Sequence, residues 1–183
     1  MFKLRENIES MNRVSRFTTE RALLLVVILT AATYCRDLAY DFILDDLSLI
    51  MMNPTITSWR NWKTVFLTDI FYSPYGPTVM ALHYRPFYMF WLMLNNLLFG
   101  MVLPWWHLTS LLLHLVVTVL VYQLAVKFLK EQWLATLAAA LFALHPIHVE
   151  SVAYVSASTD LLVALFAISR GRETCRLCGR VCL

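Results

Sequence analysis

Two adjacent aspartates, Asp45 and Asp46, follow the first long apolar stretch of the chain, in the run Tyr40-Asp41-Phe42-Ile43-Leu44-Asp45-Asp46. A carboxylate pair beside a membrane span is costly to hold and hard to explain by packing. Carboxylates serve as catalytic bases and as ligands of divalent cations. The alternative is a helix cap or turn with solvated side chains. We predict Asp45 and Asp46 as catalytic residues and as ligands of a divalent cation.

The composition places this pair in a membrane protein. Of 183 residues, 60% are hydrophobic and 15% are charged, and the mean hydropathy is +0.63. Soluble domains average roughly 45–50% apolar and about 25% charged residues. The net charge of +3 is small, and neither a basic stripe nor interleaved stacking aromatics are present, so no nucleic-acid partner is expected.

The apolar stretches predict an all-α integral membrane protein, a multi-pass helical bundle with a large outer loop that contains interfacial helices. We expect a cytoplasmic tail over residues 1–21 and an outer loop over residues 40–105. The expected spans are residues 22–39, 106–126, 133–145 and a truncated span at 161–168. A cleaved signal peptide is the competing reading of the first span. Trp59, Trp62 and Phe66 share one face of a short amphipathic helix in the outer loop.

Charge bias selects the topology. If residues 86–99 crossed the membrane, ten of the 15 basic residues would lie outside. If this stretch of 14 residues is instead re-entrant or interfacial, eleven lie on the cytoplasmic side and four outside. Cytoplasmic excess of Lys and Arg is the general rule, so the second topology is predicted. Lipid is therefore an expected partner.

This topology collects acids and histidines on the outer side from two separate loops, which is typical of a site. The members are Asp37, Asp41, Asp45, Asp46, Asp69, Glu150 and Asp160, with His83, His145 and His148. Spacing of His145, His148 and Glu150 could suit a metal, but Pro146 breaks the helical face, and shaping of a substrate pocket is favoured. His107 and His114, seven residues apart in a span, indicate hydrogen bonds between helices.

Several motifs occur in a specific order along the chain. After Asp45-Asp46 come Asn53, Trp59, His83-Tyr84-Arg85-Pro86, Phe99-Gly100, Trp106-His107-Leu108, Leu113-His114 and the run from Leu141 to Ala153 that contains His145-Pro146-Ile147-His148-Val149-Glu150. Over residues 22–167 this order resembles the transmembrane and tetratricopeptide-repeat (TMTC) proteins and their bacterial relatives. The resemblance implies the N-terminal part of a GT-C-like membrane glycosyltransferase domain, here residues 22–168.

The resemblance further implies transfer of a hexose, with mannose favoured, from a polyprenyl-phosphate donor to a hydroxyl acceptor on the luminal or periplasmic side. A protein acceptor is expected, and so is a location in the endoplasmic reticulum membrane or the bacterial inner membrane. Asp45, Asp46 and Asp160 are then the catalytic candidates, with Mg²⁺ or Mn²⁺ on Asp45 and Asp46. Arg85 would clamp the donor phosphate, and the other substrate-binding candidates are His83, His148 and Glu150.

The chain departs from the family in two places. Where the family has Gly-Arg-Ala-Asp, the chain has Ser156-Ala157-Ser158-Thr159-Asp160, so the acid is kept and the arginine is lost. Residues 169–183 lack apolar periodicity and are predicted to be an atypical, truncated tail. Two alternatives stay open: a non-enzymatic membrane scaffold or transporter piece, and a truncated fragment that is inactive alone.

Overall fold

The computed structural model describes residues 20–70 and 83–181. Most of the expected N-terminal tail lies outside these ranges, and so does Ser73-Pro74-Tyr75-Gly76, whose proline and glycine predict a turn. Within the described ranges the chain is helical with no strand, which confirms the all-α prediction. The multi-pass bundle and the GT-C-like fold remain predictions.

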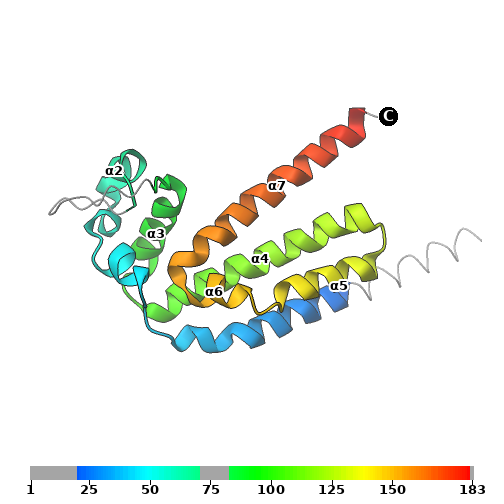
Figure 1. Ribbon diagram of the computed structural model, residues 1–183, viewed down its shortest axis with the longest axis horizontal. Helices are drawn as coiled ribbons and strands as arrows, with labels where there is room; N and C mark the ends of the chain where they lie inside the picture. The colour runs from blue at the N-terminus through cyan, green and yellow to red at the C-terminus, as the bar shows by residue number, and fades with distance from the viewer. Residues whose placement is uncertain (1–19, 71–82, 182–183) are drawn as a thin grey trace, which may run out of the picture. The chain divides into compact units, whose positions relative to one another are not determined.

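The elements follow one another as a series of long and short helices (Figure 1). A first helix covers Glu20–Ala39 and ends in the 3₁₀ turn η1 (Cys35–Ala39). After it come η2 (Leu47–Met51), η3 (Pro54–Thr57), η4 (Trp59–Asn61), α2 (Trp62–Leu67), α3 (Pro86–Phe99), α4 (Leu103–Leu129), α5 (Gln132–Ala143), α6 (His148–Ala153), η5 (Val155–Ala157) and α7 (Ser158–Val181).

Two of the described helices are long and apolar enough to cross a membrane. They are Glu20–Ala39, with a mean hydropathy of 1.7, and α4, with a mean hydropathy of 2.0. Helix α5 has 12 residues, which at a 1.5 Å rise gives about 18 Å. That length is below the roughly 30 Å of a bilayer core, so the expected span over residues 133–145 remains a prediction.

The chain divides into two compact units, of which the first contains residues 20–33, 114–148 and 164–181. In it, the second part of α4 and helix α5 run antiparallel and are joined by a tight turn (Figure 1). Lys130 occupies that turn with a φ of 59°. The His114 ring lies with its Nε2 3.1 Å from the carbonyl oxygen of Ala143, so a buried histidine ties the two helices, as the sequence indicated.

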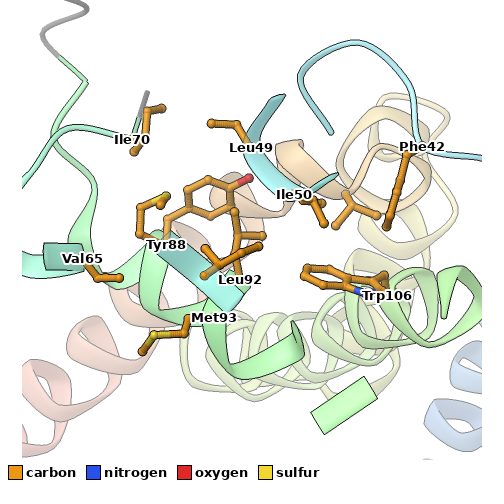
Figure 2. Close-up of a cluster of buried hydrophobic side chains, with 12 residues drawn as sticks. Phe42, Leu49, Ile50, Val65, Ile70, Tyr88, Leu92, Met93 and Trp106 are labelled. Atoms are coloured by element: carbon orange, nitrogen blue, oxygen red, sulfur yellow. The ribbon is translucent and has the colours of Figure 1, made fainter. Parts of the chain in front are cut away.

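The second unit contains residues 34–70, 83–113 and 149–163 and has its own apolar core. Helix α3 packs against η3 and α2, and the amide of Asn96 donates to the carbonyl of Ile56 at 3.2 Å. Figure 2 shows Phe42 and Trp106 at one end of the core, Val65 and Ile70 at the other, and Tyr88 between them. The amphipathic helix expected around Trp59 is present as η4 and α2.

Helix α3 has clear sequence signals at both ends. Pro86 occupies its first turn, where the missing N–H costs nothing. Gly100 ends it with a φ of 58°, a conformation that favours glycine. The indole of Trp106 donates to the Gly100 carbonyl at 2.8 Å and fixes the turn into α4.

Helix α7 is longer than the apolar pattern suggested. The apolar stretch of residues 161–168 lies within a helix of 24 residues that continues to Val181. The segment after Ile168 contains no proline, and its four arginines have good helix propensity. Apolar periodicity identifies buried faces, so it could not reveal a helix whose later turns are polar.

Candidate functional site

Asp46 joins two segments that lie far apart in the sequence. Its Oδ1 accepts hydrogen bonds from the backbone N–H of Ser156, at 2.7 Å, and from the hydroxyl of Ser156. Its Oδ2 accepts from the N–H of Ile43 at 3.5 Å. The side chain has no exposed surface. Asp46 therefore fastens residues 40–46 to residues 149–157, and we call this pair of segments the clasp.

Burial raises the pKa of Asp46 above its ordinary value, and the hydrogen bonds from Ser156 and Ile43 oppose that shift, as does nearby His107. With both oxygens hydrogen bonded and no surface open to solvent, this carboxylate is held by the protein and not presented to a ligand. Its expected roles as base and metal ligand remain predictions, and the structure shows a positioning contact.

Asp45 is exposed and makes the second link of the clasp. Its backbone N–H donates to the hydroxyl oxygen of Tyr154 at 3.0 Å. Burial raises the pKa of Tyr154, and the neighbouring Asp45 carboxylate adds to the shift. The phenol is thus neutral, and it lies beside an Asp45 carboxylate that is exposed to solvent.

Leu44 shapes the first segment of the clasp through an unusual backbone. Its φ is 48°, and this left-handed conformation costs about 1–2 kcal/mol for a residue with a Cβ. The Leu44 side chain is 75% exposed. The N–H of Asp46 donates to the Ile43 carbonyl at 3.0 Å and holds the turn. The turn directs Asp46 inward and leaves Asp45 outside.

A pocket of about 490 Å³ lies between the two segments of the clasp. Its walls are formed by Tyr40, Asp41, Ile43, Leu44, Val149, Glu150, Ala153 and Tyr154. His107 supports the wall from α4, because its Nε2 lies 3.0 Å from the Tyr40 carbonyl. The pocket is mainly apolar and carries two exposed carboxylates, those of Asp41 and Glu150.

The two candidates that precede helix α3 lie at its N-terminal end and are exposed. The N–H of His83 donates to the Asp69 carboxylate at 2.8 Å, which ties the residues before α3 to the end of the preceding described segment. Arg85 is the residue before Pro86. Burial raises the pKa of Tyr88, with Asp46 and Tyr154 adding to the shift and Arg85 opposing it. The positive charge of Arg85 is therefore felt at Tyr88.

The remaining candidates divide between different surroundings. Glu150 lines the pocket, whereas Asp160 is exposed in the first turn of α7 and is not one of its lining residues. His148 packs its ring 4.3 Å from that of Phe142 and 5.1 Å from that of His114, measured between centroids. Burial lowers the pKa of His148. The sequence thus grouped residues that the structure places in separate settings.

No metal centre is assembled by the described side chains. In the ranges 20–70 and 83–181, no group of three or more His, Cys, Asp or Glu residues gathers around a common point. The two oxygens of Asp46 are already engaged. The described residues do not fit a protein-built cation site, and the divalent cation stays a prediction.

Comparison with known proteins decides the family. The chain is 33% identical over 162 residues to "Protein O-mannosyl-transferase Tmtc2" of Drosophila melanogaster, covering 88% of this chain and 16% of that protein. It is 32% identical to mouse "Protein O-mannosyl-transferase TMTC3" over 79% of the chain and 16% of the relative. Human "Protein O-mannosyl-transferase TMTC1" is 33% identical over 72% of the chain and 15% of its own length.

The chain belongs to the TMTC family. It spans about one sixth of the length of these TMTC relatives. No family model and no solved structure matches it. Membership, together with the two apolar helices, identifies a membrane protein.

Several residues of the site were not among the sequence-based candidates. Tyr154 and Ser156 complete the clasp, and Tyr88 lies beside it. Ser156 lies 110 residues from Asp46 in the chain. The only signal was the polar character of residues 154–160 between two apolar stretches, and that pattern does not indicate which polar residue pairs with which aspartate.

Proposed function

We propose that the clasp forms part of the site at which a protein O-mannosyl-transferase passes mannose from a polyprenyl-phosphate carrier to a protein hydroxyl. The main support for this proposal is the pairing of residues 40–46 with residues 149–157, which leaves the Asp45 carboxylate exposed beside a pocket. The names of the TMTC relatives support mannose and a protein acceptor. A GT-C-like membrane domain in the endoplasmic reticulum or bacterial inner membrane is part of this proposal.

Asp45 is the general base in this proposal. The acceptor hydroxyl oxygen attacks the anomeric carbon of mannose, and its proton passes to the Asp45 carboxylate. The bond between the anomeric carbon and the phosphate oxygen breaks, and the polyprenyl phosphate leaves with the bonding electrons. Tyr154 and Asp46 fix the position of Asp45 through the clasp. Asp160 is the second acid to test if Asp45 is not the base.

Arg85 supplies the positive charge for the donor phosphate. It is exposed at the N-terminal end of α3, and its backbone carbonyl accepts from the N–H of Met89 at 3.1 Å, so the side chain can change without loss of that bond. A guanidinium binds phosphate through two parallel hydrogen bonds. His83 lies two residues away and is a secondary candidate for the same phosphate.

Substituting Arg85→Lys should raise the KM for the polyprenyl-phosphate donor roughly tenfold, because an ammonium group cannot reproduce the paired hydrogen bonds. The matched control is Arg60→Lys, an exposed arginine in η4. Steady-state transfer rates at varied donor concentration measure the change. Equal KM values for Arg85→Lys and Arg60→Lys would remove Arg85 from the donor site.

The proposal also places the clasp on the luminal or periplasmic side. In a cysteine-free background, single cysteines at the exposed positions Thr57 and Val149 should react with an impermeant maleimide added from that side. A cysteine at Glu131, in the turn between α4 and α5, should react only from the cytoplasmic side. Labelling of Val149→Cys from the cytoplasmic side alone would contradict the re-entrant placement of α3.

A segment exchange tests the proposed function. The matching part of Drosophila Tmtc2 is replaced by residues 20–168 of this chain, and the exchanged protein is expressed in cells that lack endogenous transfer of this kind. We expect transfer of mannose from a polyprenyl-phosphate donor and none from a nucleotide sugar. A non-enzymatic scaffold would give no transfer from either donor, and use of the nucleotide sugar would refute the donor assignment.

A further inference from the structure

We propose that the pocket of the clasp binds the acceptor polypeptide, and that it selects a stretch in which basic side chains flank the accepting hydroxyl. This inference rests on the proposed function and adds the chemistry of the acceptor. The starting observation is the composition of the pocket, whose walls combine aliphatic and aromatic side chains with the carboxylates of Asp41 and Glu150.

Charge argues against the donor as occupant of the pocket. None of the described residues that line it is basic, so a phosphate there would meet two carboxylates with no compensating cation, and like charges at close range oppose binding. Arg85, the exposed arginine before α3, is not a lining residue of the pocket. The donor phosphate is therefore assigned to the Arg85 side and the pocket to another ligand.

The shape and surface of the pocket suit a short peptide. A volume of about 490 Å³ accommodates a few side chains. Ile43, Leu44, Val149 and Ala153 offer apolar contact, and lysine or arginine side chains combine an aliphatic stem with a charged head. The stem would lie on the apolar wall while the head meets Asp41 or Glu150. This arrangement would bring a neighbouring serine or threonine hydroxyl toward Asp45.

The elements that form the pocket hold it open before a ligand arrives. The Tyr40 carbonyl is fixed by His107, and Tyr154 is fixed by the Asp45 N–H. The turn at Leu44, a lining residue, is held by the hydrogen bond from the Asp46 N–H to the Ile43 carbonyl. A wall held in this way lowers the ordering cost of binding a flexible peptide.

Binding of two labelled peptides to the full 183-residue chain in lipid nanodiscs tests the inference. The probes are fluorescein-labelled Leu-Lys-Thr-Lys-Leu-Ala and its counterpart Leu-Glu-Thr-Glu-Leu-Ala, followed by fluorescence anisotropy. We expect the lysine peptide to bind about tenfold more tightly at low salt, and the difference to shrink as salt is raised from about 50 mM to about 500 mM.

Variants locate the binding. Asp41→Asn and Glu150→Gln should each weaken binding of the lysine peptide about threefold to fivefold, as expected for partly exposed charge pairs. Val149→Trp, at an exposed wall position, should fill the pocket and weaken binding of both peptides at least tenfold. Glu131→Gln, an exposed acid in the other unit, should change nothing. Circular dichroism confirms that each variant is helical.

Equal affinity for the two peptides, or unchanged binding in Asp41→Asn and Glu150→Gln, would overturn the inference. So would loss of polyprenyl-phosphate-mannose binding in Val149→Trp, since that result assigns the pocket to the donor. These measurements contain no transfer step. If the chain binds the lysine peptide selectively but no mannose is transferred, the pocket assignment holds and the proposed function fails. If mannose is transferred but the two peptides bind equally, the proposed function holds and the pocket assignment fails.

Discussion

Substituting Asp45→Asn in the segment-exchanged transferase should lower the rate of mannose transfer by about 10²–10⁴-fold, the usual effect of removing a general base. The change keeps the size of the side chain but removes its negative charge and its ability to accept the proton. The backbone N–H that bonds to Tyr154 is unaffected, so the clasp should remain intact. Initial rates at saturating donor and acceptor measure the loss.

Asp41→Asn is the matched control for this prediction, because Asp41 is also exposed and belongs to the same segment. It should raise the KM for the acceptor and leave kcat within a few-fold of the parent. If Asp45→Asn transfers mannose at the parent rate, Asp45 is not the base. Glu150 and Asp160 would then be the acids to test.

The second large effect is expected for Asp46→Ala, which should destabilise the chain. The substitution removes the acceptor of the Ser156 N–H and hydroxyl and leaves both groups buried without a partner. An unsatisfied buried donor costs about 1–3 kcal/mol. Thermal unfolding in detergent, followed by helical circular dichroism, should show a clearly lower midpoint and loss of transfer in the exchanged protein.

Asp46→Asn separates position from charge. The amide keeps one oxygen for Ser156 but turns an N–H₂ group toward the N–H of Ile43. We therefore expect a smaller loss of stability than for Asp46→Ala and retention of substantial transfer. A variant that is as stable as the parent but has no transfer would show that the Asp46 charge is used in the reaction and not only in the clasp.

Local chemistry made part of the fold predictable from the sequence. Helix α3 begins at Pro86, because the first turn of a helix does not need the N–H that proline lacks. It ends before Gly100, because glycine adopts a positive φ without strain. The apolar lengths indicated the first helix and α4. The polar end of α7 was not predictable in this way, since the residues after Ile168 show no apolar period in the sequence.

The site was predictable only in outline. Its residue types and the pairing of two loops could be expected from acids on one side of the membrane. The sequence could not predict that Asp46 is buried while Asp45 is exposed. This difference depends on the left-handed turn at Leu44, which sends adjacent side chains into different environments. The partners Tyr154 and Ser156 lie more than 100 residues away, and no local pattern encodes such contacts.

The most direct test of the central claim is the rate of mannose transfer by the segment-exchanged Tmtc2, measured beside intact Tmtc2 and a Tmtc2 that lacks the matching segment. If the clasp is part of a mannosyl-transfer site, the exchanged protein transfers mannose from the polyprenyl-phosphate donor at a rate close to that of the intact relative, and Asp45→Asn abolishes that rate. A stable, membrane-inserted exchanged protein with no more transfer than the segment-lacking protein would contradict the claim.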